Sequence, residues 1–430
     1  MKKVLLRKRV VCWALYDWGN SAFSTTVMAG FFPVYYSQLS KDLSTQNSQF
    51  WFNMTLAVSS LLVGVSAPVL GAIGDRGGSR KRFLVTFAML GAAMTAGLAW
   101  VHAGMWQVGL LLYGIGTLGF SAANLFYDSM IVDVSDSEEF DLVSAFGYSL
   151  GYIGGGLLFA FNVLMVAKPE LFGLAGPDEA VRASFLSVAV WWMLFTVPLL
   201  LVVHETPTKN KASRLRAVRE GLAQLAETLR EIRKLRTLVL FLVGYWLYID
   251  AVNTVIKTAV FFGDRVLGLP QDALITALLV TQFVAFPAAL GFGWLGKRIG
   301  PRLAILLGLA VYIAALLYAW RWLASAADFY KLAIAIGMVQ GGVQALSRSL
   351  YARLVPVSRT AEFFGFFNMV GKFAAILGPL LMATVPIVIR GADERDSILA
   401  LPLLFIVGGV LLWKVDVDKG AMAAREFDNR

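Results

Sequence analysis

A few charged side chains fall inside long apolar stretches of this chain, where a charge is costly. They are Asp17, Asp250, Lys257, Arg348 and Lys372. Within a membrane-spanning helix such a charge costs about 3 kcal/mol or more, so each one needs a partner or a function. These positions are therefore the first candidates for chemistry.

Two of the acids belong to a repeated pattern. Asp17-x-x-Asn20 and Asp250-x-x-Asn253 are each followed by a hydroxyl residue. A spacing of three places the carboxylate and the carboxamide on one face of a helix. Because a carboxylate beside a carboxamide can hold a cation, an ammonium group or a proton, both pairs are candidates for solute binding or proton coupling.

Basic and amide side chains complete this candidate set. Arg348 can hold a carboxylate by two parallel hydrogen bonds, a geometry that Lys does not reproduce. Lys257 lies two helical turns after Asp250, on nearly the same helix face. Gln344 precedes Arg348 in the same stretch and is also a candidate for solute binding.

These charges support two interpretations. In the first, Arg348 or Lys372 holds the carboxylate of an amino-acid zwitterion, and Asp17 or Asp250 holds its ammonium group. In the second, the charges are structural. Asp17 and Asp250 would then tie helices together near the cytoplasmic face, through Arg348 or through helix N-termini.

The elements that carry these residues are predicted to be membrane-spanning helices. Of 430 residues, 58% are hydrophobic and only 15% are charged, and the mean hydropathy is +0.68. A soluble chain carries about 25% charged residues. Twelve apolar stretches are long enough to cross about 30 Å of hydrocarbon. The predicted spans are 13–37, 51–73, 83–101, 105–127, 143–166, 183–203, 237–261, 272–295, 302–320, 331–350, 363–389 and 397–415.

The basic residues predict the orientation of these spans. An even number of spans places both termini on one side, and the basic N-terminus and the basic loops after the second and eighth spans make that side cytoplasmic. The first span is too long for a cleaved signal, carries Asp17 and has no small-residue cleavage site after it. We therefore expect a multi-pass protein of a bacterial inner membrane, working as a monomer.

One long polar segment, residues 204–236, divides six spans from six. Its apolar residues at helical spacing predict an amphipathic helix along the cytoplasmic membrane surface. They are Leu215, Val218, Leu222, Leu225, Leu229 and Ile232. The alternative is a charged linker helix without membrane contact. We accordingly expect an N-terminal bundle at 1–203, this linker at 204–236, and a C-terminal bundle at 237–430.

The two halves repeat further motifs in the same order. The loop at 71–80 and the loop at 293–302 share Gly, Arg, Gly and Arg at equal spacing. Glu139-Phe140 and Glu362-Phe363 precede the fifth span of each half. These matches indicate duplication of a six-helix unit, an arrangement that lets two halves rock about a site between them.

At these residues the sequence resembles a known superfamily. Gly71-x-x-x-Asp75-Arg76-x-Gly78-x-Arg80 resembles the loop signature between helices two and three of major facilitator transporters. The segments Trp13–Phe23 and Gly341–Ser349 resemble hallmarks of its vacuole-effluxer-like family, whose fungal members are associated with amino-acid efflux from the vacuole. The resemblance implies an all-α fold of two pseudo-symmetric six-helix bundles. It also implies that helices one, four, seven and ten line a central cavity.

The resemblance also implies a conformational latch on the cytoplasmic side. The carboxylate of Asp75 would lie at the N-terminus of helix eleven, where it suits the helix dipole. An arginine of the same loop would reach an acid at the cytoplasmic end of helix four. The expected latch residues are Gly71, Asp75, Arg76, Gly78, Arg80 and Asp133.

Small residues and prolines predict how two helices pack. Glycines at 147, 151, 154, 155 and 156 favour close packing of the fifth span, because no strand precedes them and no Lys-Ser/Thr follows them as in a phosphate-binding loop. Gly378, Pro379 and Pro386 predict a kink in the eleventh span.

Other classes of protein fit the sequence poorly. The single cysteine, Cys12, and the two separated histidines give no disulfide, metal site or redox centre. Ser21 lies near Asp17 but has no accompanying histidine, so we expect no enzyme and no cofactor. The net charge of +10 follows from topology and does not indicate nucleic-acid binding.

We therefore expect a secondary active transporter that moves a small organic solute, such as an amino acid, by alternating access. No nucleotide-binding motif is present in the sequence, and the titratable acids favour proton coupling. The alternative is an exporter of amphipathic compounds or lipids, in which the intramembrane charges are mainly structural.

Overall fold

The computed structural model describes residues 2–77, 80–205, 227–228, 232, 235–265, 267–374, 376–388 and 395–429. Within these residues the chain is almost entirely helical. Eleven helical stretches are long and apolar enough to cross a membrane. The composite helix α2–η1–α3 supplies the twelfth span, so the predicted all-α membrane fold is confirmed.

The spans of the first half are α2–η1–α3, α4, α5, α6, α8 and α9, which we call the N half. Their bounds are α2 Lys8–Ala22, η1 Phe23–Phe31, α3 Phe32–Leu39, α4 Thr45–Gly77, α5 Arg80–Gly97, α6 Trp106–Ser129, α8 Phe140–Ala167 and α9 Pro177–Val202. Short helices α1 (Lys2–Leu5) and α7 (Ile131–Val134) lie at the ends of these spans.

The second half, which we call the C half, repeats this arrangement. Its bounds are α11 Arg236–Arg265, α12 Gln271–Ile299, α13 Pro301–Trp322, α14 Ala326–Leu354, α15 Thr360–Phe373, α16 Leu377–Val388 and α17 Leu401–Trp413. The helix α18 (Val417–Asp428) follows the last span. Most of the predicted linker at 204–236 lies outside the described residues, so its amphipathic helix and the exact domain boundaries stay predictions.

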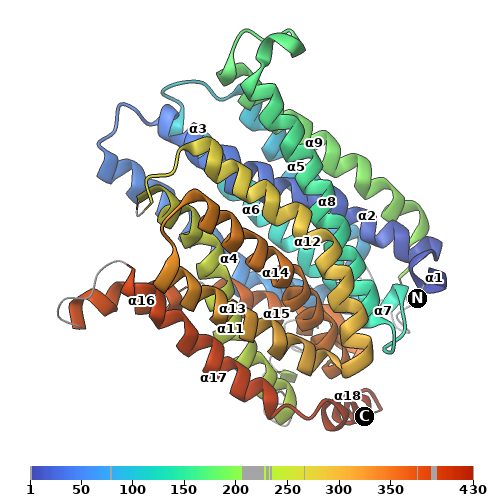
Figure 1. Cartoon of the computed structure of the whole chain (residues 1–430). Coiled ribbons are helices and arrows are strands. Elements are labelled where there is room, and N and C mark those ends of the chain that lie inside the picture. Colours follow the sequence, from blue (N-terminus) through green and yellow to red (C-terminus); the bar gives the residue numbers. More distant parts are fainter. Residues whose placement is uncertain are drawn as a thin grey trace.

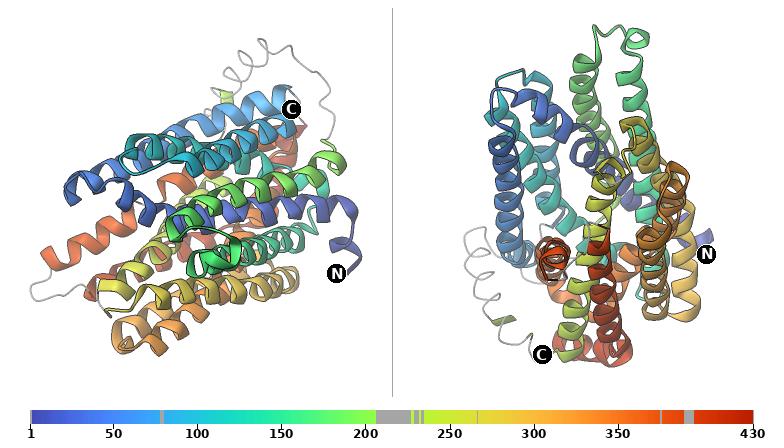
Figure 2. Two further views of the ribbon diagram at one scale, coloured as in Figure 1. Left: turned by 90° about the horizontal axis from the view of Figure 1, so that it is seen from above. Right: turned by 60° about the vertical axis from the view of Figure 1, so that its left-hand side comes forward.

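The helices run side by side in one elongated bundle (Figures 1 and 2). Both termini lie at the same end of this bundle, which we call the terminal end; the other end is the distal end. Across the halves, α4 packs on α15, and α8 packs on α12 and α14. These contacts bring the two halves together around a central axis.

The glycines of α8 pack against α2, as predicted for the fifth span. A Cβ atom added at Gly154 would lie 2.5 Å from the ring of Trp18, and one at Gly151 would lie 2.6 Å from the hydroxyl of Ser21. Only glycine therefore allows this approach, which brings the motif of the first span close to α8.

Most spans differ from the prediction by a few residues at their ends, and two also differ in helical geometry. The first is longer than 13–37 and contains the π-helix η1, whose wider turns are frequent at functional sites. The eleventh is broken between α15 and α16, just before Gly378 and Pro379, at the place where the sequence predicted a kink.

Candidate functional site

A cavity of about 330 Å³ lies between the two halves. Its walls come from α2 and η1, α6, α8, α11, α12 and α14. The resemblance implied that helices one, four, seven and ten line a central cavity. The fifth and eighth helices, α8 and α12, also contribute to its walls. The volume suits a small organic molecule. Its polar lining residues include Asp17, Asn20, Ser21, Ser24, Thr25, Asn124, Tyr127, Asp128, Tyr148, Tyr152, Thr281, Gln282, Gln340, Gln344 and Arg348.

Arg348 forms the floor of this cavity toward the terminal end. Its Nη1 atom lies 2.8 Å from Asp128 Oδ1, and its Nε atom donates to Ser144 Oγ at 2.9 Å. Its Nη2 atom donates to the backbone oxygen of Ser144 at 2.9 Å. The guanidinium is therefore bound to α6 and α8 of the N half, and a solute carboxylate would have to displace one of these partners.

Aromatic rings enclose the same guanidinium. Its Cζ atom lies 5.0 Å from the ring centre of Trp13, 5.4 Å from Tyr127 and 4.4 Å from Tyr148. Such cation–π contacts are strongest where water is excluded, and the side chain of Arg348 is only 2% exposed. The rings therefore help to hold the charge at the junction of the halves.

Asp17 is less tightly paired than Asp128. Its Oδ2 atom lies 3.8 Å from Arg348 Nη1 and accepts a hydrogen bond of 3.2 Å from the hydroxyl of Tyr127. The side chain keeps 14% of its surface exposed. The carboxylate of Asp17 can therefore receive a further cation from the cavity.

Asp128 was missed as an intramembrane charge, because the predicted fourth span ended at residue 127. The helix α6 continues to Ser129 and places Asp128 at the cavity floor. The signal in the sequence was the spacing of Asn124 and Asp128, four residues apart and so on one helix face.

The amide side chains of the cavity bind one another or nearby groups. Asn20 Nδ2 donates to Asn124 Oδ1 within the N half. Tyr152 donates to Gln344 Oε1 at 3.3 Å, and Gln282 Nε2 donates to Thr25 Oγ1 at 3.2 Å, both across the halves. Of the predicted site residues, Asp17, Asn20, Gln344 and Arg348 thus gather in one cavity.

The second copy of the motif lies elsewhere. Asp250 is fully buried and does not line the cavity; its carboxylate accepts hydrogen bonds from the backbone at the start of α16. Asn253 Nδ2 donates to the backbone oxygen of Ala374 at 2.8 Å. Lys257 lies on α11, but its side chain is outside the described residues.

Below the floor, further contacts join the halves toward the terminal end. Ser144 donates to the backbone oxygen of Ala345 at 2.6 Å. Asp141 accepts from Ser349 at 2.5 Å and pairs with Arg353 at 2.9 Å. The seam between α8 and α14 is thus polar and closed, and Ser144, Asp141 and Ser349 are buried in it.

The expected latch residues that the structure describes lie on the same closed side. Asp75 accepts hydrogen bonds from the backbone nitrogens of Ala361 and Glu362 at 3.2 and 2.9 Å, at the N-terminus of α15. Arg80 pairs with Asp133 at 3.0 Å. A Cβ atom at Gly71 would overlap the carbonyl group of Ala361. Arg76 lies in the last turn of α4, and Gly78 lies outside the described residues.

This fold and this site define a membrane transporter of the major facilitator type. The computed structure matches the proton:xylose symporter XylE with a TM-score of 0.72 at 14% identity, covering 96% of each chain. It matches FucP, solved in the outward conformation, with a TM-score of 0.71 at 10% identity, covering 95% of this chain and 100% of that one. At these identities the likeness shows the fold.

The sequence then places the chain within this class. The family described as vacuole effluxer Atg22 like matches residues 44–137 and 132–425, and the chain belongs to it. An MFS-type transporter of Bacillus subtilis, YxiO, is 37% identical over 404 residues, 93% of each chain. Autophagy-related protein 22 of Kluyveromyces lactis is 25% identical over 380 residues, 81% of this chain and 75% of that protein.

Proposed function

We propose that the chain moves a small organic solute with an amino group, such as an amino acid, by proton-coupled alternating access. The supporting observation is the charge balance at the cavity floor. Asp17 and Asp128 share the guanidinium of Arg348, which lies 2.8 Å from Asp128 and 3.8 Å from Asp17. Because an unbalanced buried charge is costly, Asp17 favours a second cation, either a proton or an ammonium group.

The rest of the cavity suits the remaining polar groups of such a solute. Gln282, Gln340 and Gln344 face it from the C half, and amides can both donate and accept hydrogen bonds. Lys257 lies on α11, but its side chain is outside the described residues, so its part in solute binding stays a prediction from the sequence.

We further propose that the closed end faces the cytoplasm of a bacterial inner membrane. Basic residues of α1, α2 and α5 and of the α12–α13 junction gather at the terminal end, as the positive-inside rule requires. Asp75 with α15, and Arg80 with Asp133, would form the latch of this end.

Reconstitution into proteoliposomes tests the proposal. Amino-acid uptake should rise with an inward proton gradient, and Asp17→Asn should abolish that rise because the amide cannot bind a proton. The matched control is Asp272→Asn, at the exposed start of α12, which should behave as the wild type. Equal uptake with and without the gradient in the wild-type protein would show that protons do not drive transport.

A second candidate function is export of amphipathic compounds. An apolar pocket of about 60 Å³ shares Ile256, Leu278, Thr281 and Gln340 with the cavity. It could receive an apolar group attached to a polar head. A thermal-shift screen of amino acids against amphipathic amines separates the two functions, because only binders stabilise the folded state.

A further inference from the structure

The break in the eleventh span leaves backbone groups without helical partners inside the membrane layer. α15 ends at Phe373, the following Ala374 has a ψ of 68°, and α16 begins at Leu377. Unsatisfied backbone groups at this depth are costly, so a break persists only where other groups bind them.

Asp250 of α11 supplies the partners for the start of α16. Its Oδ2 atom accepts from the backbone nitrogens of Ile376 and Leu377 at 3.1 and 3.0 Å. Its Oδ1 atom accepts from Gly378 at 2.7 Å. A buried carboxylate thus caps the positive end of the helix, an arrangement that the helix dipole favours.

Asn253, one turn further along α11, binds the backbone at the end of α15. Its amide nitrogen donates to the backbone oxygen of Ala374, directly after α15. Gly378 allows the close approach, because an added Cβ would overlap the hydroxyl of Thr254 and lie 2.8 Å from Asp250 Oδ1. One face of α11 therefore holds both ends of the break.

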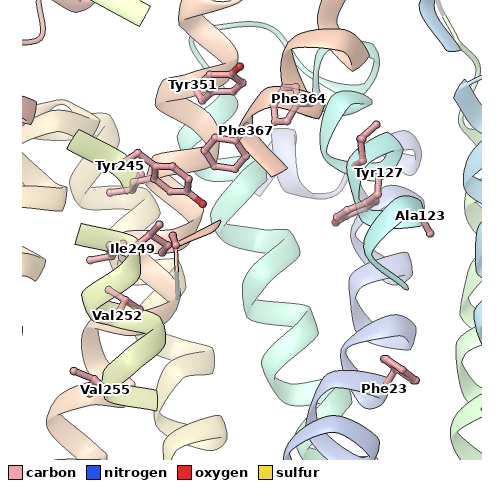
Figure 3. Close-up of a cluster of buried hydrophobic side chains, with 14 of the residues drawn as sticks. Phe23, Ala123, Tyr127, Tyr245, Ile249, Val252, Val255, Tyr351, Phe364 and Phe367 are labelled. Carbon is pink, nitrogen blue, oxygen red and sulfur yellow. The ribbon is translucent and has the colours of Figure 1, made fainter. Parts of the chain in front are cut away.

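The helix before the break, α15, begins at the carboxylate of Asp75, which belongs to the N half. Asp75 of α4 caps the first turn of α15, and a Cβ at Gly365 would lie 2.6 Å from the backbone of Ala67. α15 also packs on its own half, where Phe367 stacks on Tyr245 at 4.3 Å (Figure 3). The direction of α15 is thus set at its start by α4 and at its end by α11.

We infer that Asp250 and Asn253 are positioning residues, which hold the break so that the first turn of α15 reaches Asp75 in the closed gate. The two copies of the repeated motif then have different roles. Asp17 and Asn20 line the cavity, whereas Asp250 and Asn253 hold the break between α15 and α16. The inference rests on the proposed alternating-access function.

The test follows opening of the α4–α15 seam and needs no solute. A cysteine replaces the buried Ala361 in a Cys12→Ala background, and its reaction with a polar maleimide is timed in nanodiscs. Asp250→Asn should raise the labelling rate about tenfold, because charge-assisted hydrogen bonds are lost. Asn253→Ala should raise it about threefold. Asp272→Asn, the matched carboxylate control, should leave it unchanged.

A pH readout separates positioning from coupling. Asp250→Asn should keep the response of uptake to a proton gradient, which Asp17→Asn should lose. Wild-type labelling together with a lost pH response in Asp250→Asn would overturn the inference and make Asp250 a coupling residue. Wild-type labelling in both Asp250→Asn and Asn253→Ala would also overturn it. If the wild type transported none of the tested solutes, the labelling rates would still show whether Asp250 and Asn253 are positioning residues.

If Asp250→Asn failed to fold, two variants that keep the carboxylate of Asp250 would test the inference instead. Gly378→Ala places a methyl group against the Thr254 hydroxyl, and Asn253→Ala removes only the donor to Ala374. Both should speed labelling of the cysteine at position 361. Wild-type rates in both would show that the break does not control the seam.

Discussion

Asp128 of α6 and Arg348 of α14 form a 2.8 Å ion pair that joins the two halves at the cavity floor. Asp17 lies beside this pair, 3.8 Å from the same guanidinium nitrogen. Removing one partner of a buried pair typically costs about 3–5 kcal/mol, so we expect the floor to open only when Arg348 gains another partner. The charge on Asp17 is therefore placed where it can influence the gate.

Asp128→Asn should leave Arg348 with Asp17 as its nearest acid. The guanidinium then pairs with Asp17 and takes the place proposed for the proton. We expect the ratio of uptake with a proton gradient to uptake without it to fall to about one. The reason is that the charge of Arg348 now neutralises the charge of Asp17. Proteoliposome uptake at two external pH values measures this. A normal gradient response would contradict the proposed competition.

Arg348→Lys should weaken the floor although it keeps the charge. Lysine has no planar fork to bind Asp128 and Ser144 together, and it loses the stacking on Tyr148. Loss of one such charge-assisted bond corresponds to about 1.5–3 kcal/mol, so the uptake rate should fall about tenfold or more. Arg321→Lys, at the exposed distal end of α13, is the control. Equal rates in the two variants would refute a special role for the guanidinium.

Asp75→Asn should loosen the latch at the start of α15. The amide retains one oxygen for the two backbone nitrogens and carries no charge to meet the helix dipole. A cysteine at the buried Ala345, in the α8–α14 seam, should then react with maleimide several times faster. Asp42→Asn, on an exposed distal turn, should not change this rate. An unchanged rate in Asp75→Asn would show that the contact is not a latch.

Gly154→Val should separate α2 from α8. The new side chain would overlap Trp18, and overpacking of this kind costs about 1–3 kcal/mol. We expect a lower melting temperature together with a lower uptake rate, since Asp17 lies on the displaced helix. Gly291→Ala, where no atom lies within 4 Å of the added Cβ, should not lower the melting temperature. A wild-type melting temperature in Gly154→Val would mean that the contact is easily relieved.

Much of the fold could be predicted because the membrane restricts the possible structures. Backbone groups in hydrocarbon must bond internally, so apolar stretches of this length become helices, and twelve of them were located from hydropathy. The contact of Asp75 with the start of the eleventh span also agrees with what the family motif implied. Asp128 was missed because hydropathy ends a span before a charge, although the helix continues.

The sequence by itself determined the membrane environment, the number of spans, the internal repeat and the short list of buried charges. These properties are local, since each depends on the residues of one helix and on the solvent around it. Only the tertiary structure decided the partners of those charges. Asp17 and Asp250 occupy equivalent sequence positions, yet one faces a cavity and the other caps a broken helix. That difference depends on whether the helix packed opposite is continuous or broken, and no pattern within either motif encodes it.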